Sequence, residues 1–336
     1  MVTRRLGSQG PELSVLGFGT WVTGGPWRFG WGPIDDDDSV AAIRHAVEVG
    51  VNWIDTAAVY GLGHAETVVG RAIEPYRADE DVFVFTKCGR TWHRDGDEFR
   101  LRYDLRPESI RDQCEDSLRR LGVERIDLYQ FHWPDIATGT PVEDSWGAMA
   151  ELVDEGKVRW LGFCNSDLDL LERCERVRHV DSLQPPLSLV NRHARKELIP
   201  WCRANGTGVI AYSPMASGLL TGSFYREGLH RLAPDDFRRG APPFQEPKLS
   251  QNLALVERLG EVAERLGTTL PALAVAWTLA VPGVTGAIVG ARRPEQVDDW
   301  LGAADVVLDE ATLAELERAI EETGAGVDTP PAPPPV

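Results

Sequence analysis

The chain has 336 residues, 43% of them hydrophobic, which is ample for a large core. Acidic residues outnumber basic ones by 52 to 35, giving a formal net charge of −17, and this charge argues against nucleic acid or a membrane surface as a partner. No apolar run approaches the roughly 18 residues that a membrane span requires, and residues 1–10 lack the apolar stretch of a signal peptide, so we expect a soluble, cytoplasmic protein.

The cysteines and histidines give no sign of a disulfide framework or a metal site. The five cysteines are an odd number and form no CxxC pair. The seven histidines form no HxxxH or HxH pattern. We therefore expect reduced cysteines and no bound metal.

Short apolar segments alternate with longer amphipathic ones along the chain. A polar, hairpin-like start at 3–14 comes before the first apolar run, and four aspartates at 35–38 suit the amino end of a helix. Strands are predicted at 15–19, 51–54, 81–87, 125–131, 158–163, 180–184, 208–212 and 284–290. Helices are predicted at several places between them, including 40–50, 107–121, 141–155, 167–178, 195–205, 251–266 and 294–301.

The number and type of these units predict the fold. Eight strand-then-helix units with near-continuous apolar strands indicate a buried parallel sheet, and in this length they imply a (β/α)8 TIM barrel of the α/β class. We expect one domain over 1–336, with an N-terminal hairpin, long loops at the C-terminal face (213–250 and 308–336) and a Pro-rich tail from about 326. A doubly wound dinucleotide-binding fold is the alternative, but no GxGxxG opens a strand-to-helix step.

Polar residues follow the predicted strands where each one ends. Because strand carboxyl ends meet at one rim of a barrel, these side chains are expected to converge. They are Asp55, Lys87, His132, Asn165, Gln184 and Tyr212, with Tyr60 just beyond the second strand.

The first members of this group suit general acid catalysis. Tyrosine is a weak acid with an ordinary pKa of about 10, and a neighbouring ammonium favours its phenolate. Lys87 can be that ammonium, Asp55 can hold it, and His132 can orient a carbonyl oxygen. Such a set protonates a carbonyl oxygen as hydride reaches the carbon.

Each residue alone has an ordinary structural interpretation. Asp55 can be a helix cap or a salt-bridge partner, and Lys87 can be a barrel salt bridge. His132 can be a core histidine, and Gln184 can bond loop backbone. Their occurrence together at consecutive strand ends favours the site.

At these residues the sequence resembles the aldo-keto reductases, from about Arg4 to Ala325, and within them the bacterial branch related to general stress reductases. The motifs are IDTAAVYG, FTKCG and YQFHWPD. The resemblance implies that Asp55, Tyr60, Lys87 and His132 are catalytic.

The resemblance also implies an NADP(H) site. Asn165 in GFCNSD and Gln184 in SLQPP match the ligands of the nicotinamide carboxamide, and Tyr212 matches the residue that stacks on the ring. The run after Tyr212 matches the pyrophosphate segment, with Ser213, Pro214, Met215, Ser217, Gly218 and Leu220. AIVGARRPEQVDDW matches the adenosine segment, with Gly290, Arg292, Arg293 and Gln296 around the 2′-phosphate and Asp299 and Trp300 beyond. Gly19, Thr20, Trp21 and Asp55 complete the expected cofactor contacts.

Three positions depart from the family pattern. Cys164 stands where serine is usual, Trp300 where asparagine is usual, and Ser223 where related sequences often have lysine. Several tryptophans on or beside rim loops can wall a substrate pocket or simply anchor the loops, namely Trp21, Trp27, Trp31, Trp92 and Trp133.

The activity that the resemblance implies is NADPH-dependent reduction of an aldehyde or ketone, reversible as alcohol oxidation, with Tyr60 as the general acid. The expected partner is a small carbonyl substrate, and the expected assembly is a monomer or a weak homo-oligomer. Two alternatives remain open. One is an auxiliary, redox-sensing subunit that binds nucleotide and turns over slowly. The other is a dedicated keto-sugar reductase in a biosynthetic pathway.

Overall fold

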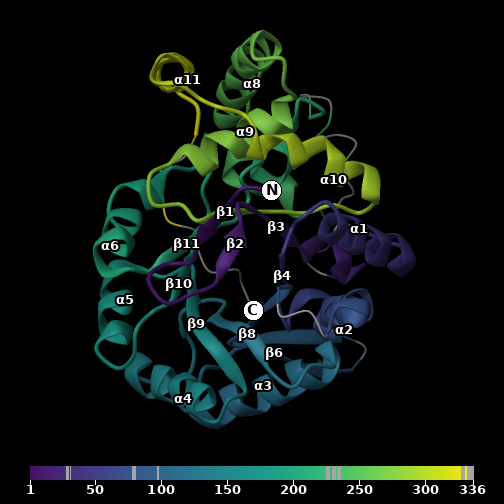
Figure 1. Ribbon diagram of the computed structural model, residues 1–336, viewed down its shortest axis with the longest axis vertical. Helices are drawn as coiled ribbons and strands as arrows, with labels where there is room; N and C mark the ends of the chain where they lie inside the picture. Colours follow the sequence, from purple (N-terminus) through teal and green to yellow (C-terminus); the bar gives the residue numbers. More distant parts are fainter. Residues whose placement is uncertain are drawn as a thin grey trace.

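The computed structural model describes residues 1–27, 30, 32–77, 81–96, 98–224, 228, 232, 236–326 and 330 (Figure 1). Trp31 lies outside these residues. So does the Pro-rich tail, except for positions 326 and 330.

Eight strands of the described chain form a closed barrel in which every neighbouring pair is parallel. Their order around the barrel is β10-β11-β12-β3-β4-β5-β8-β9, so each strand lies beside its neighbours in the chain. The strands are β3 (Leu16–Gly19), β4 (Trp53–Asp55), β5 (Phe83–Cys88), β8 (Ile126–Phe131), β9 (Val158–Cys164), β10 (Ser182–Gln184), β11 (Gly208–Ala211) and β12 (Gly286–Val289). The predicted TIM barrel and its eight strands are confirmed.

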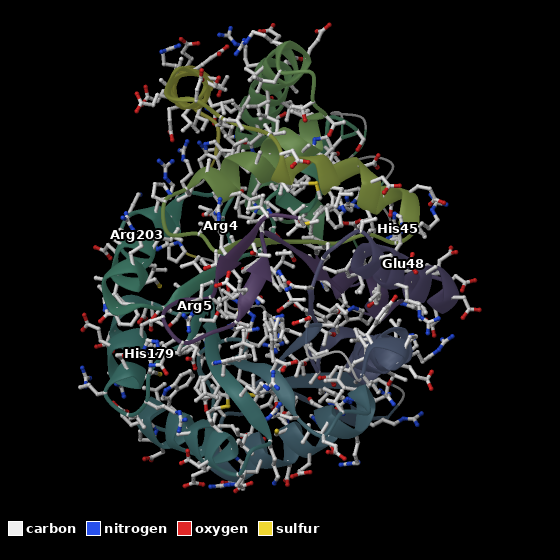
Figure 2. The ribbon with its side chains drawn as sticks, viewed as in Figure 1. Arg4, Arg5, His45, Glu48, His179 and Arg203 are labelled. Atoms are coloured by element: carbon white, nitrogen blue, oxygen red, sulfur yellow. The ribbon has the colours of Figure 1, made fainter. Side chains whose placement is uncertain are left out.

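Helices surround the strands, as Figure 1 shows. They are α1 (Asp36–Glu48), α2 (His64–Ile73), α3 (Pro107–Leu121), α4 (Val142–Asp154), α5 (Leu168–Glu175), α6 (Leu198–Asn205), α8 (Lys248–Arg265), α9 (Leu270–Ala280), α10 (Pro294–Leu301) and α11 (Glu310–Thr323). The predicted acidic start of α1 is confirmed, because the Asp35 carboxylate accepts a hydrogen bond from the backbone N–H of Asp37. Polar side chains such as His45 and Glu48 project outward from α1 at the edge of the molecule (Figure 2).

The interpretation of 308–336 as a long loop was wrong for its first half. Asp309 caps α11 through the N–H of Thr312, and the helix buries Leu316 and Ile320 against the body of the protein. Caps and periodic apolar residues of this kind predict a helix, so the signal was present in the sequence.

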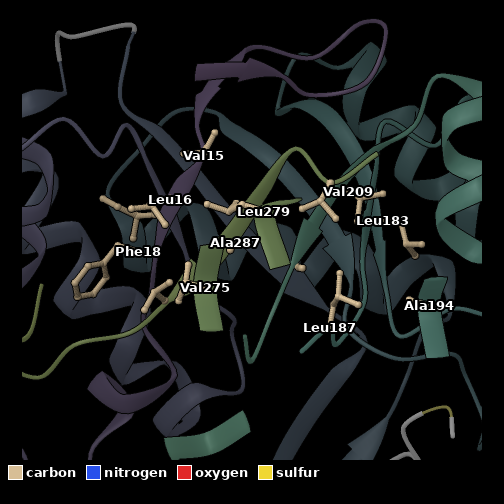
Figure 3. Packing of buried hydrophobic residues seen from close by; sticks show 14 of the residues in the cluster. Val15, Leu16, Phe18, Leu183, Leu187, Ala194, Val209, Val275, Leu279 and Ala287 are labelled. Carbon is tan, nitrogen blue, oxygen red and sulfur yellow. The ribbon is translucent and has the colours of Figure 1, made fainter. Parts of the chain in front are cut away.

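The core has two layers, one between the strands and the helices and one inside the barrel. Figure 3 shows part of the outer layer, where Leu16, Val209 and Val275 are labelled. The inner layer includes Trp53, Phe85 and Leu128, which pack with other apolar side chains of the strands and of the N-terminal hairpin.

The N-terminal hairpin was predicted and is present as β1 (Thr3–Arg5) and β2 (Glu12–Ser14). Figure 1 shows it lying across the barrel in the middle of the view. Arg4 Nη1 donates to the carbonyl oxygens of Leu279 and Val284, which fastens the hairpin to the barrel (Figure 2). This hairpin therefore closes the end of the barrel that is opposite the strand carboxyl ends.

A second hairpin, β6 (Arg90–Asp95) and β7 (Glu98–Tyr103), was not predicted. It follows β5 directly, so it begins beside the strand end that carries Lys87. Its strands are rich in charged residues and lack the continuous apolar run that marks a barrel strand. None of the described helices is long and apolar enough to cross a membrane.

Candidate active site

The polar residues of the candidate site form one inward-facing layer above the apolar interior of the barrel. Successive inward positions on a strand are two residues apart, so Trp53 leads to Asp55 and Phe85 leads to Lys87. Asp55 Oδ1 accepts a hydrogen bond of 2.8 Å from Gln184 Nε2. Strands β4 and β10 are not neighbours, so this bond crosses the barrel interior.

Lys87 and Asp55 form a buried ion pair in this layer. Lys87 Nζ lies 2.5 Å from Asp55 Oδ2 and donates to the Thr56 carbonyl at 2.9 Å. Both side chains are almost completely buried. Burial is the largest single effect and works against the charged form of Lys87, but the Asp55 carboxylate, with smaller contributions from Tyr60 and Cys164, raises the pKa of Lys87 above its ordinary value.

Tyr60 lies beside this pair, on the loop that follows β4. Lys87 Nζ is 3.5 Å from the Tyr60 hydroxyl oxygen. Burial raises the pKa of Tyr60 to about 12, although the positive charge of Lys87 acts in the lowering direction. The sequence led us to expect the lowering effect of Lys87, and the larger opposing effect of burial was not foreseen. The phenol is therefore fully protonated near neutral pH.

The backbone holds Tyr60 in place through a close contact between two loops. Gly61 has a φ of +58°, and a Cβ atom there would overlap the carbonyl oxygen of Gly24. A side chain at position 61 would therefore push the two loops apart. The Trp27 ring completes the contact, with its centroid 6.4 Å from that of Tyr60.

His132 is the other polar group beside the Tyr60 ring. The two ring centroids are 5.6 Å apart in an edge-on arrangement. Burial lowers the pKa of His132 well below its ordinary value, and the positive charges of Lys87 and Arg90 lower it further. His132 is therefore a neutral imidazole near pH 7, able to donate one hydrogen bond but unable to serve as a strong acid.

The residues predicted to hold a nicotinamide carboxamide also meet. Asn165 Nδ2 donates to the His132 carbonyl at 3.0 Å, and Asn165 Oδ1 accepts from the Tyr212 hydroxyl at 2.7 Å. The thiol of Cys164 takes part where a serine hydroxyl is usual. Its Sγ lies 3.1 Å from Asn165 Nδ2 and 3.6 Å from Gln184 Oε1, so it lies between the two amide side chains.

The loops at this rim contain left-handed backbone at residues other than glycine. Asn165, Ser213, Ala216 and Ser217 have φ values between +49° and +60°. Such conformations are uncommon outside glycine and are concentrated at functional sites. No pattern in the sequence indicated them.

A single cleft of about 1160 Å³ connects these groups. All but three of the predicted site residues line it. Lys87 lies beneath the cleft surface behind Tyr60, Leu220 is buried in the core, and Arg293 is exposed outside the lining. Trp21, Trp27 and Trp133 are pocket walls, whereas Trp92 packs beside the pocket without lining it.

The far end of the cleft, beyond residues 213–218, contains arginines as well as the acid Asp299. Arg292 lines it, and its backbone N–H donates to Gln296 Oε1 at 2.7 Å. Burial lowers the pKa of Arg292, and the charges of Arg238 and Arg293 add to this effect, so three guanidinium groups are close enough to interact. Trp300 closes this end, and within the described residues its buried indole N–H has no hydrogen-bond partner.

Comparison with known proteins identifies the family, because residues 15–321 match the Aldo/keto reductase family. The chain is an aldo-keto reductase. It is 34% identical to the aldo-keto reductase YhdN of Bacillus subtilis over 94% of this chain and 92% of that protein. It is also 34% identical to the NADH-specific methylglyoxal reductase of Escherichia coli over 94% of this chain and 98% of that protein.

Solved structures agree with this assignment. The glycerol dehydrogenase AKR11B4 of Gluconobacter oxydans is 35% identical, with a TM-score of 0.87 over 99% of this chain and 98% of that one. The aldo-keto reductase AKR11C1 of Bacillus halodurans, in its holo form, is 25% identical with a TM-score of 0.77 over 95% and 96% of the chains. The protein is therefore an NAD(P)H-dependent oxidoreductase that acts on small carbonyl compounds.

Sequence reasoning missed several residues that line this aldo-keto reductase's cleft or lie buried beneath it. Gln130 donates to Asp55 Oδ1 at 3.3 Å and lies two residues before His132, so the two-residue period of an inward strand face would have indicated it. Arg90 and Leu101 come from the unpredicted hairpin, and Phe237 and Arg238 come from the long loop after β11. Neither the hairpin nor the loop gave a sequence signal that its residues would reach the cleft.

Proposed function

We propose that this aldo-keto reductase reduces an aldehyde or ketone with NADPH and that Tyr60 donates the proton. The observation that carries the proposal is the Tyr60 hydroxyl, which lies 3.5 Å from a buried ammonium that Asp55 holds in place. A neutral His132 stands beside the same ring.

These residues suit protonation of a carbonyl oxygen. The Tyr60 phenol keeps its proton near pH 7, and the Lys87 ammonium stabilises the phenolate that remains after the proton has left. The neutral His132 can donate a hydrogen bond to the same carbonyl oxygen and fix its orientation. In the direction of alcohol oxidation, the Tyr60 phenolate would accept the proton.

The described residues fit an extended nicotinamide dinucleotide. The cleft is long and continuous, with amide side chains near Tyr60, left-handed backbone along its middle and arginines at its far end. The amides of Asn165 and Gln184 would hold the carboxamide, and residues 213–218 would contact the pyrophosphate. When bound, the nicotinamide supplies the hydride.

NADPH is proposed over NADH because of the charge at the far end. Only NADPH carries a 2′-phosphate, and guanidinium groups bind phosphate through paired, charge-assisted hydrogen bonds. Arg292 lines the cleft just before α10 begins at Pro294, so the amino end of that helix adds a favourable dipole. The Escherichia coli relative is NADH-specific, so the preference needs its own test.

The function is tested by following the oxidation of NADPH and NADH with a panel of aldehydes, ketones and keto-sugars. We expect many turnovers with simple aldehydes. Tyr60→Phe removes the acid and should lower kcat by about 10² to 10⁴. It should leave cofactor affinity, measured by fluorescence titration, within about threefold of wild type.

Tyr76→Phe is the matched control, because it removes a hydroxyl on the short helix Glu74–Tyr76, away from the cleft lining. Activity of Tyr60→Phe comparable to that of Tyr76→Phe would remove Tyr60 from the role. Tight cofactor binding without turnover of any carbonyl would favour an auxiliary nucleotide-binding subunit instead.

A further inference from the structure

We propose that Gln130 is a positioning residue for proton donation, because its side-chain amide fixes the carboxylate that holds the Lys87 ammonium beside Tyr60. The inference rests on the proposed function, in which Lys87 stabilises the Tyr60 phenolate. Gln130 lies on β8, is completely buried and does not line the cleft. It can therefore act on the reaction only through its neighbours, and a completely buried amide is costly unless its donors and its acceptor are used.

The two carboxylate oxygens of Asp55 have different partners. Oδ2 faces Lys87 Nζ at 2.5 Å. Oδ1 accepts from two amides, at 2.8 Å from Gln184 Nε2 and at 3.3 Å from Gln130 Nε2. The terminal torsion of an aspartate is soft, so its carboxylate turns easily unless both oxygens are held. The two amides hold Oδ1 and so leave Oδ2 directed at the lysine.

The hydrogen bonds around Gln130 select one orientation of its amide. Gln130 Oε1 accepts from Gln184 Nε2 at 3.3 Å, while Gln130 Nε2 donates to Asp55 Oδ1. The reverse orientation would place Oε1 against the carboxylate and Nε2 against the amide nitrogen of Gln184. Both contacts would then lack a matching donor or acceptor. Asp55 Oδ1 and the two glutamine amides therefore form a closed triangle of hydrogen bonds.

The barrel provides the space that Gln130 occupies. In the strand register, Gln130 lies opposite Lys87 of β5 on one side and opposite Gly162 of β9 on the other. A Cβ atom at position 162 would lie 2.8 Å from Gln130 Cγ and 3.2 Å from its Oε1. Even an alanine there would push the amide away from its partners. The glycine therefore gives Gln130 room at the level of the barrel that carries the ammonium.

Loss of the Gln130 amide would reach Tyr60 through Asp55 and Lys87. Without one of the donors to Oδ1, the carboxylate is freer to turn, and the Lys87 ammonium is held less firmly at 3.5 Å from the Tyr60 hydroxyl. The charge of Lys87 lowers the pKa of Tyr60, and the charge of Asp55 raises it. A less firmly held Lys87 and a less fully hydrogen-bonded Asp55 both act to raise the pKa of Tyr60.

Gln130→Leu tests the inference because it keeps the approximate size of the side chain and removes its hydrogen bonds. With the best aldehyde of the panel, kcat for reduction should fall about 10- to 100-fold. The KM for the aldehyde should stay within about threefold, because Gln130 does not line the cleft. Oxidation of the corresponding alcohol should show its rise in rate at higher pH than in wild type. A wild-type kcat and pH profile would overturn the inference.

Gln130→Glu is a second variant that keeps the shape of the side chain. At low pH the introduced carboxyl group retains a proton that it can donate to Asp55 Oδ1, because two adjacent carboxylates do not both ionise easily. Reduction should then be faster than in Gln130→Leu. Its rate should fall as the pH rises and this proton is lost, whereas the wild-type rate stays level until Tyr60 ionises. A rate that follows the wild-type pH dependence would contradict the inference.

Gln113→Leu is the matched control, because Gln113 is also a buried glutamine with several hydrogen bonds. Its Oε1 accepts from the Gly89 N–H at 2.8 Å, and its Nε2 donates to the Asp104 carbonyl at 3.1 Å and to Ser109 Oγ at 3.0 Å. None of these bonds involves Asp55. Gln113→Leu should lower the denaturant midpoint as Gln130→Leu does, but it should keep the wild-type pH profile. The same pH shift in both variants would mean that Gln130 only supports the fold.

A crystal structure of Gln130→Leu separates this inference from the proposed function. If wild type reduces carbonyls through Tyr60 while Gln130→Leu keeps its kcat and pH profile, only the inference fails. If wild type turns over no carbonyl, the proposed function fails, and the structure of the variant decides the inference by itself. A turned Asp55 carboxylate with a longer distance from Lys87 Nζ to the Tyr60 hydroxyl would support the positioning role. Unchanged contacts among these three residues would overturn it.

Discussion

Lys87 is held between the Asp55 carboxylate and the Thr56 carbonyl, so its ammonium cannot turn away from the Tyr60 hydroxyl. Two opposing effects act on that hydroxyl. Burial raises its pKa and the charge of Lys87 lowers it, with burial the larger effect. Lys87 therefore restrains the rise in pKa without making the phenol unusually acidic.

Lys87→Met should consequently make Tyr60 a weaker acid. Loss of the positive charge, with Asp55 left in place, should raise the pKa of Tyr60 further, because both burial and the Asp55 charge act upward. Reduction should slow by about 10² or more, and alcohol oxidation, which needs the phenolate, should show its rise in rate at higher pH than in wild type.

Asp55→Asn is the informative partner variant. It keeps the shape of the side chain but not its charge, so the loss of kcat should be smaller than in Lys87→Met. The effects of the two substitutions should be clearly non-additive in the double variant, because the two groups act through one phenol. The pH profile of kcat for both directions is the measurement. An unchanged profile in Lys87→Met would mean that the lysine serves only the fold.

At the scale of elements, α2, α3 and β5 meet at a second buried ion pair. Arg120 Nε of α3 lies 2.6 Å from Glu66 Oε2 of α2, and Thr86 Oγ1 of β5 donates to Glu66 Oε1 at 2.6 Å. Glu66 is completely buried. Because Thr86 directly precedes Lys87, this contact supports the strand end that carries the ammonium.

Arg120→Met should destabilise the protein by about 3 to 5 kcal/mol, because it leaves the Glu66 carboxylate buried without its charged partner. Arg119→Met is the control on the adjacent position of the same helix, where the side chain is exposed, and it should stay within about 0.5 kcal/mol. The denaturant midpoint, followed by circular dichroism and by activity, is the measurement. Equal midpoints for the two variants would contradict a stabilising role for the buried pair.

Whether the sequence predicts an element depends on which of its faces are buried. The barrel strands are enclosed on both faces, so they appear in the sequence as continuous apolar runs, and their polar ends located Asp55, Lys87 and His132. The β6–β7 hairpin lies on the surface and has charged strands, so the same criterion could not find it. Arg90 was missed with it. The left-handed backbone at Asn165 and Ser217 is imposed by tertiary contacts and has no local signal.

At the scale of the whole molecule, the arginines at the far end of the cleft carry a charge opposite in sign to the net charge of the protein. The chain carries −17, which repels an anionic cofactor at long range. Yet Arg292 lines the far end of the cleft, with Arg238 and Arg293 close enough to interact with it, and under the proposed function these groups would attract a phosphate at short range. These two effects respond differently to salt, since ions screen exposed charges beyond about 10 Å at 0.1 M and affect a close, partly buried pair less.

This difference predicts how salt and substitution change cofactor choice. Arg292→Ala should weaken NADPH binding about 10- to 100-fold and leave NADH almost untouched, since only NADPH has a 2′-phosphate. Arg293→Ala should have a smaller effect, because Arg293 is exposed outside the cleft lining. Raising the salt from about 20 to 200 mM should relieve the general repulsion of both cofactors while affecting the close arginine contacts of NADPH less. The preference for NADPH should therefore persist at the higher salt in wild type and be lost at both salt concentrations in Arg292→Ala, as dissociation constants for both cofactors would reveal. Arg119→Ala removes the same charge from the outer surface of α3 and should behave as wild type in this respect. A wild type that binds NADH more tightly, or an Arg292→Ala variant that loses both cofactors equally, would contradict a 2′-phosphate site at Arg292.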